Sequence, residues 1–171
     1  MRVLAIDPGS KQSALVFYDS TARTVLIHQI LDNWEVLGQL GGLWNPMPTH
    51  LAIEMIASYG MAVGAEVFET CRWVGRFQER WFRWATDMRQ NWGDAKLVYR
   101  REVKLHMCGV ANAKDGNVRQ ALIDQFGGKA KAIGKKATPG PLHGIKADEW
   151  QALGVAVTFA ERQTARTREA A

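Results

Sequence analysis

The sequence predicts an α/β fold in which a mixed five-stranded sheet is flanked by helices. Three observations lead to this fold class. Short apolar or β-branched stretches dominate the first part of the chain, strand and helix patterns alternate after it, and polar turn formers separate the elements. With 171 residues and 47% hydrophobic content, the chain can bury one sizeable core. We therefore expect a single domain spanning residues 1–171.

The expected strands each end at turn-forming or charged residues. The apolar run Val3–Ile6 is stopped by Asp7-Pro8-Gly9-Ser10, which indicates a buried strand ending in a tight turn. Two further stretches, 14–18 and 24–29, complete a three-stranded meander. Residues 51–53 form a fourth strand that ends at Glu54, and residues 96–99 suit a fifth.

The expected helices follow from apolar spacing and from glycine stops. From residue 60 to residue 84, apolar side chains recur at three- and four-residue steps, which predicts a long amphipathic helix. Residues 101–107 and 117–126 suit shorter helices, the second stopped by two glycines. Residues 129–144 are rich in Lys, Gly and Pro and predict a mobile basic loop. A last helix is expected from about residue 146 to residue 162.

Charge and composition narrow the classes of partner. The formal net charge of +5 favours polyanionic partners, although ordinary solubility charge explains it equally well. Cys71 and Cys108 lack the spacing of a zinc site or a disulfide framework. No segment approaches the roughly 20 apolar residues of a membrane span, and the N-terminus lacks the apolar run of a signal peptide. We expect a cytoplasmic protein without membrane association or a small-molecule cofactor.

Four acidic residues are candidates for metal chemistry. Asp7 and Glu54 each follow an apolar strand, so neighbouring strands would place their carboxylates together at one edge of the sheet. Asp148 and Glu149 open the final helix and could project back toward this edge. Such oxygen ligands suit Mg²⁺ or Mn²⁺, and two ions roughly 4 Å apart can support phosphodiester hydrolysis. By pattern alone, however, acidic residues at these positions are more often turn formers or helix caps.

Motifs along nearly the whole chain resemble the RuvC family of Holliday-junction resolvases. The opening Val3-Leu4-Ala5-Ile6-Asp7-Pro8-Gly9 is similar to the start of these enzymes. Further matches follow in family order: Ile53-Glu54, Val103-Lys104, Ala113-Lys114 before Val118, and the segment from Asp148 to Ala156. Residues 55–61 and 148–153 resemble phage-associated members more than the housekeeping bacterial enzyme.

The resemblance implies a ribonuclease H-like fold and a homodimer that nicks two strands of a four-way junction symmetrically. It also implies four acidic or histidine metal ligands, of which Asp7, Glu54 and Asp148 match three. Gln151 stands at the fourth position, where it offers a weaker, neutral oxygen donor. Glu149 or His143 are alternatives for the fourth ligand, with Glu149 favoured.

The resemblance also implies DNA-binding residues. Lys104 and Lys114 match phosphate-contacting or catalytic lysines of the family, and Tyr59 lies where a loop inserts a side chain at the junction centre. Further basic residues expected to contact the DNA backbone are Arg100, Arg101, Lys129, Lys131, Lys135 and Lys136. The helix over residues 60–84 is the expected dimer surface, to which some of Trp73, Trp81 and Trp84 would contribute unless they pack in the core.

Three other functions remain open. Asp7-Pro8-Gly9-Ser10 also resembles the first phosphate loop of actin-like phosphotransferases, but those enzymes need two lobes and this chain has length for one. A ribonuclease of the same fold would use the same carboxylates on RNA or on an RNA/DNA hybrid. A non-catalytic protein that binds branched DNA is a third possibility, because Gln151 departs from the family pattern.

Overall fold

The computed structural model describes residues 1–58, 60, 62–88 and 94–170. Its main sheet has five strands in the order β3-β2-β1-β4-β5, which confirms the predicted mixed sheet. The strands are β1 (Arg2–Asp7), β2 (Gln12–Asp19), β3 (Thr24–Asp32), β4 (His50–Met55) and β5 (Lys96–Tyr99). The first three strands pair antiparallel, whereas β4 runs parallel to both β1 and β5. The meander and the following alternation are therefore as the sequence predicts.

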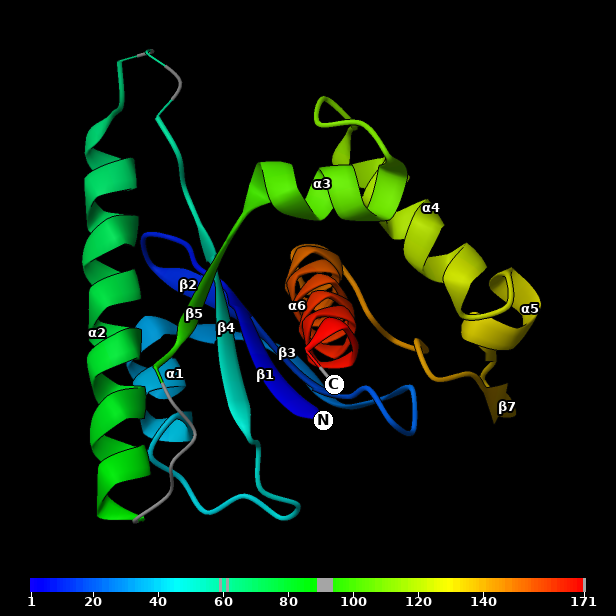
Figure 1. The fold of residues 1–171 in the computed structure, drawn as a ribbon, viewed down its shortest axis with the longest axis horizontal. Coiled ribbons are helices and arrows are strands. Elements are labelled where there is room, and N and C mark those ends of the chain that lie inside the picture. The colour runs from blue at the N-terminus through cyan, green and yellow to red at the C-terminus, as the bar shows by residue number, and fades with distance from the viewer. Residues whose placement is uncertain (59, 61, 89–93, 171) are drawn as a thin grey trace.

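Helices cover both faces of the sheet (Figure 1). On one face lie α1 (Asn33–Gln39) and α2 (Ala65–Asp87), and on the other lies α6 (Glu149–Glu169). The side chains of β1 alternate between these layers: Val3 and Ala5 pack in the core beneath α6, whereas Leu4 and Ile6 pack in the core beneath α2. Because both faces are buried, β1 is apolar throughout its centre.

The long helix α2 buries its aromatic stripe against the sheet. Trp73, Trp81 and Trp84 are 6%, 0% and 5% exposed, so these three side chains belong to the core and not to an exposed dimer surface. Trp34 on α1 is 64% exposed and stacks with the guanidinium of Arg76. The helix begins and ends a few residues later than the sequence predicts.

The last helix, α6, occupies the centre of the second layer. It is buried from Glu149 to Ala160 and extends to Glu169, further than predicted. Two shorter helices, α3 (Arg100–Cys108) and α4 (Asp115–Gln125), pack against it. A Cβ at Gly154 would lie 3.1 Å from Val103 and 3.2 Å from Val118, so this glycine allows the three helices to approach closely. None of the described helices is both long enough and apolar enough to cross a membrane.

The basic segment 129–144 is ordered secondary structure, so the prediction of a mobile loop is wrong. It forms α5 (Lys129–Ala132) and a small hairpin of β6 (Gly134–Lys135) and β7 (Thr138–Pro139). Leu142 is 1% exposed, and its amide donates to the carbonyl of Ala132 at 2.8 Å. The buried leucine therefore anchors a segment whose composition suggests disorder.

The sequence analysis does not predict the helix α1. Its cap is local: Asp32 accepts a hydrogen bond from the amide of Trp34, and Glu35 accepts one from the amide of Asp32.

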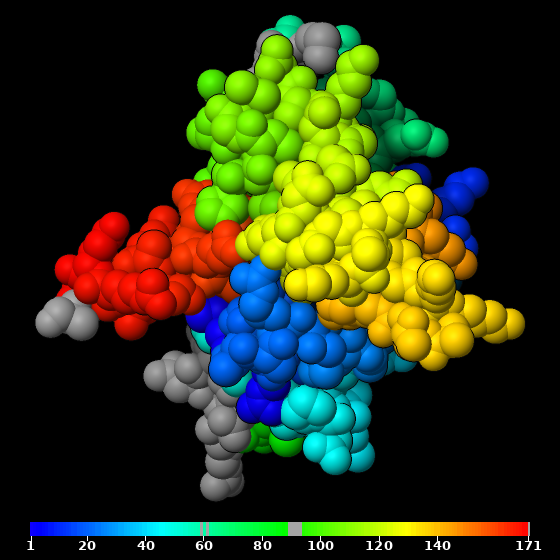
Figure 2. All heavy atoms as spheres, turned by 90° about the vertical axis from the view of Figure 1, so that its right-hand side faces the viewer, coloured from blue at the N-terminus to red at the C-terminus, as the bar shows by residue number. Residues whose placement is uncertain are grey.

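On the opposite side of the molecule, the β2–β3 turn lies against the end of α4 (Figure 2). There the guanidinium of Arg23 donates to the carbonyl of Gln125 at 2.8 Å.

Candidate metal centre and phosphate-binding residues

Asp7 and Glu54 stand side by side because two parallel strands end together. β1 and β4 are in register, with Ile6 opposite Ile53, so the next residue on each strand is a carboxylate. The two side chains share a hydrogen bond, which requires a proton between them in the metal-free protein. They line a pocket of about 320 Å³ together with Arg100 and residues 55–57. The predicted juxtaposition of these two carboxylates is therefore present.

A buried polar network holds the turn that follows Asp7. The hydroxyl of Ser13 donates to Asn33 Oδ1 at 2.6 Å and accepts from the amide of Gly9 at 3.3 Å. Asn33 in turn donates to the carbonyl of Gly9 at 2.9 Å. A Cβ at Gly9 would lie 2.4 Å from the carbonyl oxygen of Gln12, so only glycine fits this turn. The network fixes the direction in which the chain leaves Asp7.

Burial makes the carboxylate pair hold a proton. Burial and the neighbouring Glu54 raise the pKa of Asp7 to about 9. Burial also raises the pKa of Glu54, although the guanidinium of Arg100 opposes this shift. Two ionised carboxylates that lie side by side in a buried site repel each other, and a cation is needed to neutralise them. The pair therefore favours a nearby positive charge.

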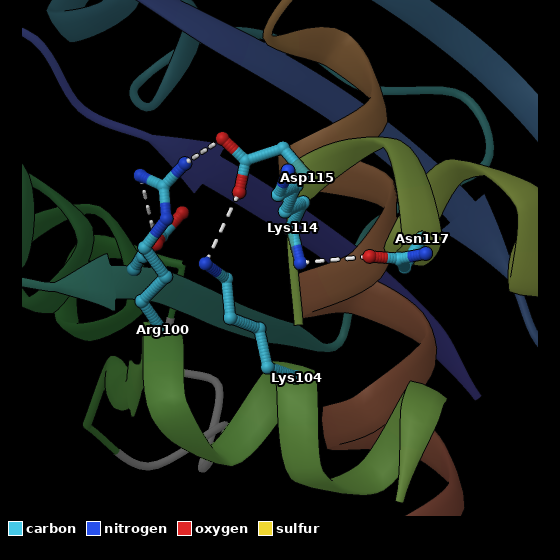
Figure 3. Close-up of polar contacts among 6 residues, drawn as sticks. Arg100, Lys104, Lys114, Asp115 and Asn117 are labelled. Carbon is cyan, nitrogen blue, oxygen red and sulfur yellow. Dashed lines mark hydrogen bonds and ion pairs between the residues drawn. The ribbon is translucent and has the colours of Figure 1, made fainter. Parts of the chain in front are cut away.

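Arg100 supplies part of that charge from the beginning of α3. Its Nη1 lies 3.7 Å from Glu54 Oε1, and its Nη2 lies 2.6 Å from Asp115 Oδ2. The other oxygen of Asp115 lies 3.4 Å from Lys104 Nζ. Figure 3 shows the Asp115 carboxylate between the two basic side chains, one turn apart on α3. Two of the predicted DNA-binding residues are thus adjacent to the carboxylate pair.

Asp148 approaches the same edge from α6. It is exposed at the helix N-cap, and its charge contributes to raising the pKa of Asp7, so the two carboxylates are electrostatically coupled. The preceding residue, Ala147, has a φ of 43°. This left-handed conformation costs about 1–2 kcal/mol for a residue with a Cβ, so neighbouring contacts must stabilise it.

Glu149 provides such contacts. Its carboxylate is 2% exposed and lies 3.0 Å from Nδ1 of His28 on β3. The same oxygen accepts the amide of Lys146 at 2.8 Å. Glu149 therefore ties the turn before Asp148 to the sheet. The carboxylate expected as an alternative fourth metal ligand contacts His28 and the amide of Lys146 in this structure.

We expect Glu149→Gln to lower the free energy of unfolding by about 2 kcal/mol, because it leaves a buried pair incomplete. Chemical denaturation of the two proteins measures this loss. Glu169→Gln is the matched control, since it removes the same charge from the exposed end of the same helix. An unfolding free energy equal to that of wild type, combined with weaker Mg²⁺ binding, would instead assign Glu149 to the metal.

The remaining candidates are Gln151, His143, Lys114 and Tyr59. Gln151 is buried one turn after Asp148. His143 is exposed, and its Nδ1 lies 3.0 Å from the carbonyl oxygen of Ile133 in the hairpin region. Lys114 caps α4 next to Asp115, and its amide donates to Asn117 at 2.8 Å (Figure 3). Tyr59 lies outside the described residues.

The predicted basic residues form two separate groups. Arg101 lines a pocket of about 360 Å³ with Arg100 and Lys104, beside the carboxylate pair. The second group consists of exposed lysines on α5 and its hairpin: Lys129, Lys131, Lys135 and Lys136. α5 follows the far end of α4, an 11-residue helix about 16 Å long (Figure 1). The structure does not bring these seven side chains to one edge.

The donors at the edge fit a hard divalent cation. Asp7 and Glu54 offer carboxylate oxygens, the ligand type that Mg²⁺ and Mn²⁺ prefer, and burial raises the pKa of both carboxyl groups. Within residues 1–58, 60, 62–88 and 94–170, no three His, Cys, Asp or Glu side chains are close enough to form a metal-binding cluster. The described geometry thus contains a two-carboxylate centre, with Asp148 electrostatically coupled to it.

Two solved structures are similar to this chain. Thermus thermophilus RuvC has 19% sequence identity and a TM-score of 0.57. T. thermophilus RuvC in complex with a Holliday junction substrate has 17% identity and a TM-score of 0.64. Each comparison covers 94% of this chain and 93% of the other. No protein-family model and no curated protein matches the chain. The structural likeness confirms the predicted ribonuclease H-like fold.

Four residues of the site are missing from the sequence-based candidates. Ser13 and Asn33 hold the turn after Asp7, His28 pairs with Glu149, and Asp115 pairs with Arg100 and Lys104. Ser13 and His28 come from the meander, and Asn33 begins α1. Ser13 lies 20 residues from Asn33 along the chain, and His28 lies 121 residues from Glu149. Asp115 directly follows Lys114, but nothing in that dipeptide indicates which cations the carboxylate contacts.

Proposed function

We propose that this protein is a structure-selective DNA endonuclease that resolves Holliday junctions or other branched DNA. The observation that carries the proposal is the Asp7–Glu54 pair beside two phosphate-binding candidates, Arg100 and Lys104. The fold is similar to that of two RuvC structures, one of which is in complex with a Holliday junction substrate. Carboxylates and cations at one edge are the two components that metal-dependent phosphodiester hydrolysis requires.

In this proposal Asp7, Glu54 and Asp148 hold Mg²⁺, with Mn²⁺ as a substitute and two ions as the expected number. The bound metal supplies Lewis acidity and lowers the pKa of a water. Arg100 and Lys104 bind and orient the phosphate, and Lys114 adds a third cation at the start of α4. Gln151 offers a neutral oxygen near Asp148. Glu149 positions Asp148 through its contact with His28.

Symmetric cleavage of a four-way junction needs two active sites, so we propose a homodimer. The exposed side of α2 is the proposed surface, because Phe68 and Phe82 are 62% and 54% exposed on it. Large apolar side chains at the surface favour burial against a partner. A purified protein that stays monomeric on junction DNA in light scattering would contradict this arrangement.

Two alternatives keep a specific observation in their favour. The carboxylate pair would serve equally well on RNA or on an RNA/DNA hybrid, because phosphodiester hydrolysis is common to all three. Gln151, at the position expected for an acidic ligand, favours a protein that binds branched DNA without cutting it. Both alternatives predict nucleic-acid binding. The preferred substrate distinguishes the ribonuclease from the proposed DNA endonuclease, and the absence of cleavage distinguishes the binding protein.

The decisive experiment incubates the purified protein with a labelled four-way junction, a matched linear duplex and an RNA/DNA hybrid, each with Mg²⁺, Mn²⁺ or EDTA. Paired, metal-dependent nicks confined to the junction support the proposal. Cleavage of the hybrid alone would assign a ribonuclease. Binding of the junction without cleavage in either metal would assign a binding protein, and Gln151→Asp is then the variant expected to gain turnover.

A further inference from the structure

Asp115 is an acid in the middle of the cations that DNA is expected to contact. Both of its carboxylate oxygens are engaged, one by Arg100 at 2.6 Å and the other by Lys104 at 3.4 Å (Figure 3). This arrangement is how a phosphate group engages two cations, through two of its oxygens. The carboxylate thus occupies the position between the two cations at which a DNA phosphate would bind.

We propose that Asp115 is an intramolecular competitor for the phosphate subsite formed by Arg100 and Lys104, and that it sets how tightly DNA must bind to displace it. This inference rests on the proposed function, since it identifies the backbone phosphate as the ligand of these two cations. The free protein keeps the subsite filled, and DNA opens it.

The exposure of the three side chains makes displacement feasible. Arg100 and Asp115 are 46% and 49% exposed, so solvent and a phosphate can reach both groups. The side chain of Lys104 is 19% exposed, so it has less freedom to move than the other two. An exposed ion pair contributes little to folding, so its exchange for a doubly charge-assisted phosphate contact costs the fold little.

The two cations stabilise the ionised form of Asp115. Burial alone would raise the pKa of Asp115, but Arg100 and Lys104 lower it below its usual value. Asp115 therefore stays ionised at any pH at which DNA binding is measured. Arg100 also faces Glu54 at 3.7 Å, so the same guanidinium links the competitor to the carboxylate pair. Exchange of its partner on DNA binding would thus occur next to the metal centre.

The test measures DNA affinity without metal, by fluorescence anisotropy in EDTA at several salt concentrations. We expect Asp115→Asn to bind the four-way junction about three- to fivefold more tightly than wild type. The slope of log K against log salt should steepen by about one. Asp124→Asn is the matched control, because it removes the same charge from the exposed far end of the same helix. Asp115→Glu, which keeps the charge, should give a smaller gain than Asp115→Asn.

A double-mutant cycle excludes a general charge effect. In an Arg100→Gln background, Asp115→Asn should lose most of its gain, because the competitor then has one of its two cations missing. Weaker DNA binding by Asp115→Asn would overturn the inference and show that Asp115 orders the cations for DNA. A gain no larger than that of Asp124→Asn would overturn it as well.

The two levels of the proposal fail differently. Wild-type protein that binds junction and duplex, but shows no gain in Asp115→Asn, contradicts only the competitor. Wild-type protein that binds the RNA/DNA hybrid in preference to DNA contradicts the proposed substrate, and the same cycle on the hybrid then tests the subsite. Wild-type protein that binds no nucleic acid contradicts both.

Discussion

Asp7→Asn should reduce metal-dependent junction cleavage by roughly a thousandfold or more while leaving junction binding unchanged. The substitution removes one carboxylate from the two-carboxylate centre, and losing several kcal/mol of transition-state stabilisation corresponds to this factor. Arg100 and Lys104, which we expect to bind the phosphate, lie on α3 and are not altered. Single-turnover cleavage with Mg²⁺ and anisotropy in EDTA measure the two quantities separately.

Glu54→Gln should lose cleavage to a similar extent, because the register of β1 and β4 places its carboxylate beside Asp7 in the same centre. Asp124→Asn, at the far end of α4, should cleave at the wild-type rate. Wild-type cleavage by Asp7→Asn would remove this carboxylate from the reaction. Loss of binding together with cleavage would instead indicate that Asp7 maintains the DNA-contacting surface.

The sequence predicts the sheet well because its strands are short apolar runs bounded by polar turns. Asp7 and Glu54 each follow such a run, so their meeting at one edge could be anticipated from strand pairing alone. The helical spacing of the tryptophans in α2 is compatible with either a core or an interface. Only their burial against the sheet shows that they belong to the core.

Features that depend on tertiary contacts could not be predicted from the sequence. The segment 129–144 has the composition of a mobile loop, yet a single buried leucine and a two-stranded hairpin order it. Glu149 has the chemistry of a metal ligand, yet a histidine from β3, 121 residues away, pairs with it. In both cases the deciding partner is distant along the chain, and side-chain type alone does not indicate it.

The raised pKa values of the carboxylate pair predict that the metal-free protein becomes less stable as the pH rises. In the unfolded chain Asp7 loses its proton near pH 3.8, whereas in the folded protein it keeps the proton up to about pH 9. Between these values the folded state binds more protons than the unfolded state, so the free energy of unfolding falls with pH. The slope attributable to Asp7 reaches at most about 1.4 kcal/mol per pH unit.

The difference between wild type and Asp7→Asn reports the contribution of the Asp7–Glu54 pair, because the titrating groups outside the pair are common to both proteins. Denaturation in EDTA from pH 5 to pH 8 should show wild type losing stability relative to the variant by several kcal/mol. Mg²⁺ should raise the melting temperature of wild type more at pH 8 than at pH 5, since protons compete with the metal for the same oxygens, and should have little effect on Asp7→Asn. Parallel pH profiles for the two proteins would show that Asp7 ionises freely without metal, and the electrostatic basis for a metal at this edge would then be lost.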